Sequence, residues 1–407
     1  MTNCNKRSWS WRPSVSVVAS MGEGYDPRLG QTVPMRIVLV VPGGVDPPGS
    51  PRVIPFIHGL VADLSSRHEL LVIAVGHDSV SGSWPLFGAE VINVPVGRHG
   101  KADIARVVRA VSSIAGAGGR PDVVHGLWAN LPGFAASMAA YRHRRPSVVS
   151  VCGGEFAALA DIGYGGGLRR GTLLMAQAST RAATAVTVAT SWMHAHVTAA
   201  GGRVDEIIPL GADTSIFSRT AATPIPYRVA HVGNLNRVKD QSLLLQAFRL
   251  VLDSCPDAEL DIAGLDTLDG QVQHLATTLD LDPHVRFHGY LPAPELAAML
   301  SEATLHVLSS RHDAGPVAVL EAAACGVPTI GTAVGHVADL ATMPHPGALA
   351  VSDRRPEVLA DGIVAALADD QRRRLVADSA HDWAVAHDAA HTSRAFEALY
   401  RRVIANR

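Results

Sequence analysis

Two carboxylates separated by a loop of small residues are the first place in this chain where side chains could do chemistry. Asp313 and Glu321 have seven residues between them in the stretch RHDAGPVAVLEAAACGVP. The residues on both sides of Glu321 are apolar, so a helix there has no obvious exposed face. A buried carboxylate needs a polar partner, and ligand hydroxyls are one candidate. The alternative is an ordinary solvated glutamate on a helix.

The sequence around these carboxylates predicts a strand, a polar loop, a short helix and a second strand. The apolar run Leu305 to Leu308 precedes the loop, and another begins near Thr329. Pro316 favours a first helical turn, whereas Gly326 and Pro328 are typical of a helix end. The free amides at such a helix start suit an anion such as phosphate, and doubly wound α/β sheets bind nucleotides at this kind of loop. The residues expected to form the anion-binding loop are Ala314, Gly315, Pro316 and Val317.

A second strand, loop and helix carries cations. The apolar strand Arg228 to Val232 leads into GNLNRVKD, and apolar residues then recur at helical spacing. Arg237 and Lys239 lie in the loop, where cations beside free amides suit a diphosphate. The alternative is a solvated lysine at a helix start, which the helix dipole mildly disfavours.

These motifs resemble the donor site of the family-4 retaining glycosyltransferases. In that family two acidic residues with this spacing precede small residues, Gly and Pro, and the resemblance assigns Glu321 to the hydroxyls of the nucleotide ribose. The first acid is usually Glu and is Asp313 here, for which the resemblance implies a catalytic position beside the sugar. The family has an Arg directly after a Gly and a Lys six residues after that Gly. Lys239 matches the Lys, Asn234 stands in place of the Arg, and Arg237 is interpreted as the substitute charge.

Two further segments resemble the same family. In HVRFHGYL, the backbone near Gly289 matches the segment that lies against the nucleobase. In the loop PGGVDPPGSPR, the family's Gly-Gly pair on the diphosphate falls on Gly49 and Ser50 by its distance from Pro42. Gly and Pro also make plain turns, which is the alternative for that loop.

Two polar residues follow strands in the amino-terminal half. His125 ends an apolar strand in DVVHGLWANLPG, and we expect it to face the crevice at the carboxyl edge of the sheet. Glu155 follows SVVSV and is expected to bind acceptor hydroxyls or to assist proton removal. The alternatives are a structural histidine and an ordinary loop carboxylate. The resemblance supports His125, because family members place a His in this strand-end loop near the reacting sugar, some of them two residues later.

The glycine-rich segment GYGGGLRRG, residues 163–171, is not interpreted as a dinucleotide fingerprint. It lacks the third glycine of GxGxxG, and the preceding EFAALADI is predicted to be helical instead of the first strand of a βαβ unit. We interpret the segment as a mobile loop that lines the acceptor side. The sequence contains no GxxxxGK[ST] motif, which excludes a P-loop.

The elements that must position these residues alternate between short β-rich runs and helical segments, which predicts parallel strands with crossover helices. Strands are expected at 36–41, 70–75, 91–96, 123–128, 147–151, 185–189 and 206–210, and then at 228–232, 259–262, 285–288 and 305–308. Helices are expected at 104–115, 133–141 and 168–183, in the segment containing residues 243–252, and at 356–368, 371–386 and 393–404.

Composition limits the class of protein. The 407 residues are 47% hydrophobic and 18% charged, which is typical of a globular protein with two domains. The net charge of −2 gives no bulk reason to expect nucleic acid or a strongly anionic membrane as partner. No apolar run is long enough to span a membrane. The four cysteines have no metal-ligand spacing, and reduced thiols in the cytoplasm are the simplest interpretation.

The domain prediction has five parts. Residues 1–34 are expected to be a poorly ordered extension, with Met35 as the structural beginning and as a possible true start. Residues 35–217 form an acceptor-side Rossmann-like domain, 218–227 a linker, and 228–388 the domain for the nucleotide-sugar donor. Residues 389–407 form a helix which, by the resemblance, packs back on the first domain.

The resemblance implies an α/β protein of GT-B architecture, with two Rossmann-like doubly wound domains that face a central cleft. It implies transfer of a sugar from a nucleoside-diphosphate sugar, UDP- or GDP-linked, with retention of configuration and with neither metal nor cofactor. The expected acceptor is a sugar, a lipid-linked molecule or a small molecule, with no nucleic acid and at most peripheral membrane contact. Two alternatives stay open: a nucleotide-sugar epimerase or hydrolase of the same fold, and an inactive protein that only binds the donor.

Overall fold

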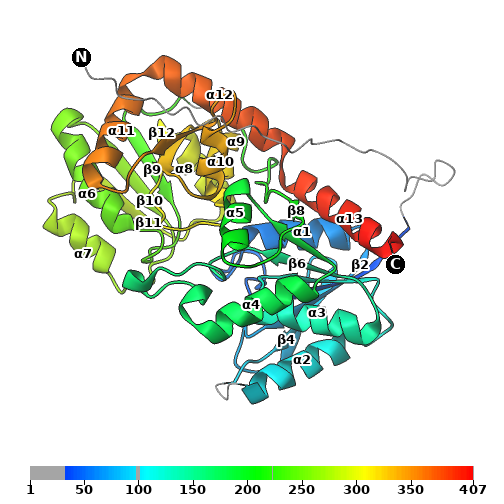
Figure 1. Ribbon diagram of the computed structural model, residues 1–407. Coiled ribbons are helices and arrows are strands. Elements are labelled where there is room, and N and C mark those ends of the chain that lie inside the picture. The colour runs from blue at the N-terminus through cyan, green and yellow to red at the C-terminus, as the bar shows by residue number, and fades with distance from the viewer. Residues whose placement is uncertain (1–32, 98–100, 222, 407) are drawn as a thin grey trace, which may run out of the picture. The chain divides into compact units, whose positions relative to one another are not determined.

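The computed structural model describes residues 33–97, 101–221 and 223–406, which form two sheets in successive parts of the chain (Figure 1). The first sheet has eight strands in the order β3-β4-β2-β1-β5-β6-β7-β8, and all pairs are parallel except β3 with β4. Its strands are β1 (Arg36–Val41), β2 (Glu69–Val75), β3 (Gly82–Leu86), β4 (Ala89–Val94), β5 (Val123–Leu127), β6 (Ser147–Val151), β7 (Ala185–Val188) and β8 (Glu206–Ile207).

Helices cover both faces of this sheet. They are α1 (Pro55–Ser65), α2 (Lys101–Ala115), α3 (Leu131–His143), α4 (Arg170–Ala182), α5 (Ser191–Ala199) and the terminal helix α13 (Ala389–Ala405). The central strand β1 shows how the sequence produces this arrangement. Val38 and Val40 point into the core formed with α2 and α3, whereas Ile37, Leu39 and Val41 point into the core formed with α1 and α13. A strand covered on both faces is apolar at every position, which explains the run IVLVV.

The second sheet has six parallel strands in the order β11-β10-β9-β12-β13-β14. Its strands are β9 (Arg228–Val232), β10 (Glu259–Ala263), β11 (Val285–Gly289), β12 (Leu305–Leu308), β13 (Thr329–Thr332) and β14 (Ala348–Val351). The helices of this half are α6 (Gln241–Ser254), α7 (Gln271–Thr278), α8 (Ala293–Ser301), α9 (Val317–Ala324), α10 (Gly335–Ala341), α11 (Pro356–Ala368) and α12 (Asp370–Ala386).

The terminal helix α13 packs on the first sheet and not on the second. Phe396, Leu399 and Tyr400 are buried in the same core as Ile37 and Leu39 of β1. Figure 1 shows α13 beside α1, at the end of the chain that follows α12. In the described chain the last helix therefore lies on the first sheet, beside α1.

Most predicted elements are present, and their ends differ by a few residues at most. The strands expected at 36–41, 147–151, 228–232 and 305–308 and the helix at 356–368 have the observed bounds. The elements that the sequence did not predict are β3, β14, α1, α5, α7, α8 and α10. These are short, and β3 is an edge strand (GSWPL) that contains a proline and has no apolar alternation.

The predicted helix EFAALADI is wrong. Only Ala160–Ile162 forms a 3₁₀ turn, because the segment before it folds against the glycine-rich stretch that follows. The backbone N–H of Gly167 donates to the carbonyl of Ala157, and Leu159 and Tyr164 exchange backbone hydrogen bonds of 2.9 and 3.0 Å. A Cβ on Gly165 would lie 2.0 Å from the Ala157 carbonyl oxygen, so only glycine fits there. The stretch expected to be a mobile loop is thus a hydrogen-bonded turn.

The predicted extension, residues 1–34, lies outside the described residues except for 33 and 34. The other predicted boundaries, at 35–217, 218–227, 228–388 and 389–407, stay predictions. Among the helices in the described part of the chain, none is both long and apolar enough to cross a membrane.

Candidate functional site

The predicted cation and the first predicted carboxylate meet at the carboxyl ends of two neighbouring strands. Lys239 follows β9 and Asp313 follows β12, and these strands are paired in the sheet. The Nζ atom of Lys239 lies 2.5 Å from Oδ2 of Asp313, and both side chains are partly buried. Ser309 Oγ donates to the carbonyl of Lys239 at 2.8 Å, so the second loop holds the backbone of the first.

Glu321 lies in α9 with 6% of its surface exposed. Among the residues that the structure describes, none donates a hydrogen bond to its carboxylate. Burial raises the pKa of Glu321 to about 7, and the positive charge of Lys239 partly opposes this rise. The expectation of a buried glutamate is confirmed, and its carboxylate has unused capacity to accept hydrogen bonds.

A buried polar cluster holds the loop that carries Lys239. The Nδ1 atom of His231 lies 2.9 Å from the carbonyl of Val307, which makes Nδ1 the donor and leaves Nε2 as an acceptor. Gln241 Nε2 lies 3.1 Å from His231 Nε2 and 3.1 Å from the Asn234 carbonyl, and its Oε1 accepts from the Asn236 backbone N–H. Through these hydrogen bonds, Gln241 and His231 hold the loop in place. Neither residue stands in a motif, so the sequence did not identify them as part of the site.

The other predicted residues of this loop lie at the surface. Arg237 is exposed and forms no ion pair with a described residue. Asn234 is exposed, and its Oδ1 accepts from the Leu265 backbone N–H at 3.2 Å. Asn234 therefore ties the loop after β9 to the loop after β10, while the substitution of charge by Arg237 stays a prediction.

The loop before α9 is packed against the end of the first sheet. Ala314 is buried, and its carbonyl accepts from the Thr190 hydroxyl at 2.8 Å. A Cβ on Gly315 would lie 2.6 Å from the Cβ of Ala189, which explains the glycine. Pro316 is the N-cap of α9 and Val317 is its first residue, so the helix starts one residue later than the sequence predicts.

The remaining predicted nucleotide-binding positions have open backbone geometry. Gly289 ends β11 with a φ of 67°, its carbonyl accepts from Gly264 at 2.7 Å, and the space beside its Cα is empty. Gly49 has a φ of 92° and equally open surroundings. Ser50 Oγ donates to Asp46 at 2.7 Å, which fixes the turn. The roles of Gly289, Gly49 and Ser50 stay predictions.

The expected position of His125 is wrong. The residue is fully buried in the middle of the first sheet and does not face a crevice. Its Nδ1 lies 2.6 Å from the Tyr400 hydroxyl and its Nε2 lies 2.8 Å from Ser150 Oγ. Burial lowers the pKa of His125 to about 3, so the imidazole is neutral. The return of α13 covers this strand, and a short sequence motif does not contain that information.

Glu155 is also placed differently from the expectation. Its carboxylate accepts from three backbone N–H groups, those of Ala129 at 3.0 Å, Cys152 at 3.2 Å and Gly153 at 2.7 Å. Burial raises the pKa of Glu155, and these hydrogen bonds oppose the rise. The side chain holds two strand-end loops together instead of pointing at an acceptor.

An aromatic cluster that sequence reasoning missed lies beside Asp313. His312 packs against Trp192 and His196 of α5, with ring centroids 5.1 Å apart in each case, and against Tyr164 at 5.9 Å. Its Nε2 lies 3.3 Å from the Gly153 carbonyl. The only sequence feature that could have identified His312 as part of the site is its position directly before Asp313.

Further polar contacts join the strand-end loops of the two sheets. Asp339 of α10 accepts from the backbone N–H groups of Ser191 at 2.6 Å and Trp192 at 3.0 Å, which caps the start of α5. Arg311 forms an ion pair of 2.5 Å with Asp161. The residues around Lys239 and Asp313 are thus supported by elements of both sheets.

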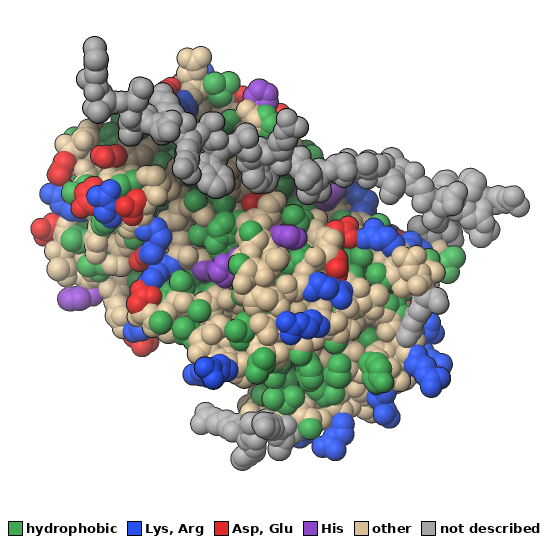
Figure 2. Space-filling model, in the orientation of Figure 1, with side chains coloured by type: hydrophobic (Ala, Val, Ile, Leu, Met, Phe, Trp, Pro, Cys, Tyr) green, Lys and Arg blue, Asp and Glu red, His purple; other side chains and the backbone are tan. Residues whose placement is uncertain are grey.

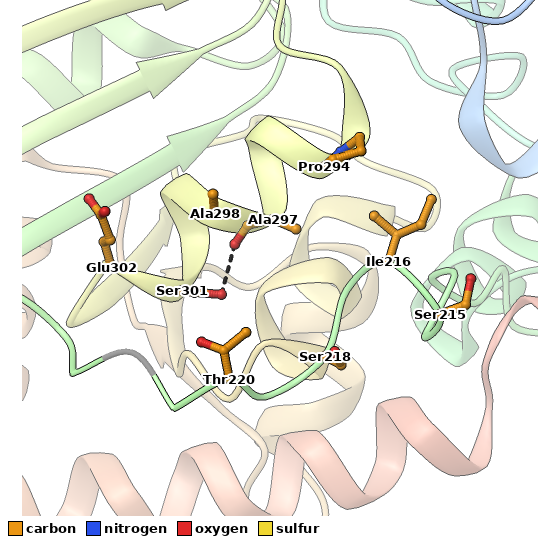
Figure 3. Close-up of a pocket in the computed structure, with 9 residues that line it drawn as sticks. All are labelled: Ser215, Ile216, Ser218, Thr220, Pro294, Ala297, Ala298, Ser301 and Glu302. Atoms are coloured by element: carbon orange, nitrogen blue, oxygen red, sulfur yellow. Dashed lines mark hydrogen bonds between the residues drawn. The ribbon is translucent and has the colours of Figure 1, made fainter.

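Two hollows in the described surface lie away from these residues. One, of about 500 Å³, is lined by α8 and by the chain segment that connects the two sheets (Figure 3). In Figure 3 the Ser301 hydroxyl is turned back to its own helix, where it bonds the Ala297 carbonyl. The other, of about 620 Å³, lies at the amino-terminal ends of α2, α3 and α4. None of the predicted site residues lines either hollow.

Two family models match successive parts of this chain. Residues 53–211 match the model described as glycosyl transferase 4-like domain, and residues 215–383 match glycosyl transferases group 1. The chain is 27% identical over 232 residues to a D-inositol 3-phosphate glycosyltransferase of Corynebacterium glutamicum (strain R), covering 53% of this chain and 55% of that protein. It is 29% identical over 177 residues to a GDP-mannose-dependent alpha-(1-6)-phosphatidylinositol dimannoside mannosyltransferase of Mycobacterium tuberculosis (strain ATCC 25177 / H37Ra), covering 41% and 45%. The chain spans about half the length of the curated relatives it matches.

Solved structures share the fold at low sequence identity. Sucrose-phosphate synthase from Thermosynechococcus elongatus superposes with a TM-score of 0.74 at 17% identity, over 91% of this chain and 99% of that one. Anabaena Alr3699/HepE, solved in complex with UDP-glucose, gives 0.68 at 18% identity, over 90% and 100%. Together the two family models cover most of the chain and show that it belongs to the glycosyl transferases group 1 family, and the solved structures show that it has the GT-B fold.

Proposed function

We propose that this protein transfers a sugar from a nucleoside-diphosphate sugar to an acceptor, with retention of anomeric configuration and without a metal ion. The observation that carries the proposal is Glu321, a buried carboxylate that accepts no hydrogen bond from a described residue, near the ion pair of Lys239 and Asp313. A carboxylate in such a place is costly unless a ligand donates to it. The two hydroxyls of a ribose are suitable donors.

The ion pair supports the diphosphate part of the proposal. Lys239 carries a cation at the loop after β9, and the first amides of α9 lie at the end of the neighbouring strand. A diphosphate that binds between them takes over Lys239 as a partner, and Asp313 is then available to a hydroxyl of the sugar. In the reaction, the same cation stabilises the charge that develops on the departing diphosphate.

In the proposed reaction, the acceptor attacks and the diphosphate leaves on the same side of the sugar. The acceptor hydroxyl attacks the anomeric carbon from the side on which the diphosphate leaves, and its proton passes to a phosphate oxygen of the leaving group. This route needs no general base, which fits the finding that His125 and Glu155 are already engaged with the protein. The base of the donor is uracil or guanine, in line with the UDP complexes of the Anabaena protein and the GDP-mannose dependence named for the mycobacterial relative.

Nucleotide binding tests the site first. A thermal-shift panel of UDP, GDP and their common sugars should show a raised Tm for one base, because a ligand that binds only the folded state stabilises it. Glu321→Gln should weaken the ribonucleotide by about 10- to 100-fold, the expected effect of losing a charge-assisted hydrogen bond. The 2′-deoxynucleotide should discriminate much less between the two proteins. Equal loss for both nucleotides would remove Glu321 from the ribose site.

Product analysis separates the proposal from its alternatives. The preferred donor is incubated with and without a panel of acceptors, and the released nucleoside diphosphate and the anomer of the product are identified. A transferase releases diphosphate in step with glycosylated acceptor, and NMR of the product then reports retention or inversion. Release without any acceptor indicates a hydrolase, a changed donor sugar indicates an epimerase, and binding without turnover indicates an inactive donor-binding protein.

A further inference from the structure

The helices α2, α3 and α4 carry charge of one sign on their outer surface. The exposed charged side chains described on these helices and next to their ends are all arginines, namely Arg106, Arg109, Arg142, Arg144, Arg169, Arg170 and Arg181. The acid of α2, Asp103, is buried and pairs with Arg106 at 3.3 Å, so the other six arginines carry the charge of this face. The net charge of the whole chain is −2, so the overall composition does not reveal that arginines are concentrated on these three helices.

An apolar stripe lies on the outer side of α3, between the arginines of α2 and α4. The least buried residues of α3 before its last turn are Leu131, Phe134 and Met138, and Tyr141 is 82% exposed. Their spacing of three and four places them on one face of the helix. Leu174 of the neighbouring α4 is 62% exposed. Leu131 also packs against the core of the first sheet, whereas the exposure of Tyr141 and Leu174 is unusual for a soluble helix, which normally presents polar side chains on its outer face.

Figure 2 shows the same combination on the surface. Over the region that α2, α3 and α4 occupy in Figure 1, hydrophobic side chains gather in the lower part of the view, with Lys and Arg side chains around them. Acidic side chains lie elsewhere on the visible face.

We propose that the outer face of α2, α3 and α4 docks on an anionic membrane surface. Arginines attract and bind lipid phosphates, and a stripe of aromatic and aliphatic side chains between them enters the boundary between headgroups and acyl chains. Charge alone would also suit a nucleic acid, but a phosphate backbone gives no partner to the exposed Tyr141 and Leu174 or to the partly exposed Phe134 and Met138. The apolar stripe therefore favours the membrane over a nucleic acid.

The position of the hollow of about 620 Å³ agrees with this docking. It lies at the amino-terminal ends of the same three helices, and its lining is largely apolar, with Ile104, Leu131 and Met175 among its residues. Arg169 also lines it. A membrane bound to this face would lie along the helices that form the hollow. The docking itself does not depend on the sugar transfer proposed above, because it concerns only the surface of the folded chain.

Co-sedimentation of the full chain with vesicles tests the docking. Vesicles that contain phosphatidylglycerol should bind the protein, and pure phosphatidylcholine vesicles should bind it much less. The triple variant Arg109→Glu, Arg142→Glu, Arg170→Glu should lower the partition coefficient by roughly a hundredfold, since each cation near an anionic surface contributes about fivefold. Binding should also weaken in about 0.5 M salt, which screens surface charge.

A matched variant controls for net charge. Arg249→Glu, Arg372→Glu and Arg374→Glu change the same number of exposed arginines on α6 and α12, and this protein should keep most of its vesicle binding. Tyr141→Ser with Leu174→Ser should lower the salt-resistant part of the binding severalfold, whereas Leu375→Ser, a leucine 65% exposed on α12, should not. The Tm of each variant shows whether it is folded.

Three results would overturn the proposal. The first is equal binding to anionic and neutral vesicles. The second is an equal loss of binding in the two triple variants, which would make the effect one of net charge. The third is tight binding to a nucleic-acid duplex without binding to vesicles, which would assign the basic face to a different class of partner.

Discussion

Two buried glutamates at the ends of the two sheets have opposite surroundings. Glu155, beyond β6 of the first sheet, accepts hydrogen bonds from three backbone N–H groups. Glu321, in α9 of the second sheet, accepts none from a described residue, and burial raises its pKa to about 7. The difference shows that burial alone does not identify a ligand-binding carboxylate. The unused capacity to accept hydrogen bonds is the more informative property.

The same contrast holds for the basic residues of the two sheets. His125 uses both ring nitrogens on Tyr400 and Ser150. Lys239 is paired with Asp313 at the strand ends, where a ligand can exchange with either partner. His125 and Glu155 of the first sheet therefore hold the protein together, whereas Lys239 and Glu321 of the second half keep capacity for a ligand. The predictions below test this division, from the largest expected effect to the smallest.

The largest effect is expected in the pH dependence of stability at Glu321. Its pKa is raised from 4.5 to about 7 on folding, so the folded state binds more protons than the unfolded state between these pH values. The contribution of protonated Glu321 to the free energy of unfolding is fully present below pH 4.5. It is lost as the pH rises towards 7, which lowers the free energy of unfolding by roughly 3 kcal/mol. In Glu321→Gln this loss should disappear, so the variant should gain in free energy of unfolding relative to the parent between pH 5 and 8. Urea unfolding at several pH values measures this.

Glu295 is an exposed glutamate of α8, and the variant Glu295→Gln is the control for that measurement. It should follow the parent at every pH. If Glu321→Gln also follows the parent, the carboxylate is hydrated or hydrogen-bonded in solution, and its contrast with Glu155 disappears.

The next effect concerns the cation. Lys239→Ala should weaken binding of the preferred nucleoside diphosphate by about 10- to 100-fold, the effect of losing a charge-assisted contact of about 1.5–3 kcal/mol. The bare nucleoside should bind almost equally to both proteins, because it carries no phosphate. Calorimetric titration of both ligands gives the ratio. Equal weakening of nucleoside and diphosphate would indicate that the loop has collapsed.

Glu155→Gln should affect stability instead of binding. An amide offers one acceptor oxygen and an NH₂ group where the carboxylate accepted from Ala129, Cys152 and Gly153. At least one backbone donor is then left unpaired, at a cost of about 1–3 kcal/mol. The Tm should fall while the affinity for nucleoside diphosphate stays the same. An unchanged Tm with lost transfer activity would restore the acceptor-side role expected from the sequence.

His125→Phe should cost less, because the ring is replaced by one of similar shape. The Tyr400 hydroxyl loses its partner, while Ser150 keeps its hydrogen bond of 2.6 Å to Thr187. Leaving one buried hydroxyl unpaired costs about 1 kcal/mol or slightly more. The Tm should fall modestly and kcat for transfer should be retained. A folded variant whose kcat falls a hundredfold would show that the histidine contacts a reacting group.

The positions of the candidate site residues were predicted better at the second sheet than at the first, for a physical reason. Lys239, Asp313 and Glu321 stand in short motifs, and the strands before them place their loops at one edge of a parallel sheet. Local pattern therefore determines both their types and their position. His125 and Glu155 have partners up to 275 residues away or on other loops, such as Tyr400 of α13. No local pattern in the sequence around His125 indicates that a terminal helix covers its strand.

The smallest effect is expected at the substitute cation. Arg237 is exposed and unpaired among the described residues, and Asn234 uses its side chain to bond Leu265. If Arg237 serves the diphosphate, Arg237→Ala should weaken the diphosphate a fewfold and combine non-additively with Lys239→Ala, since both would act on one group. No hydrogen bond or ion pair with a described residue holds Arg237 there, so we expect a change of less than about twofold, as for other solvated surface cations. Asn234→Arg should then tighten the diphosphate by restoring the missing charge, and titration of the same two ligands measures both variants. If Asn234→Arg instead lowers the Tm without tightening the ligand, its bond to Leu265 matters more than its place in the family pattern, and Lys239 with the amides of α9 is the complete diphosphate site.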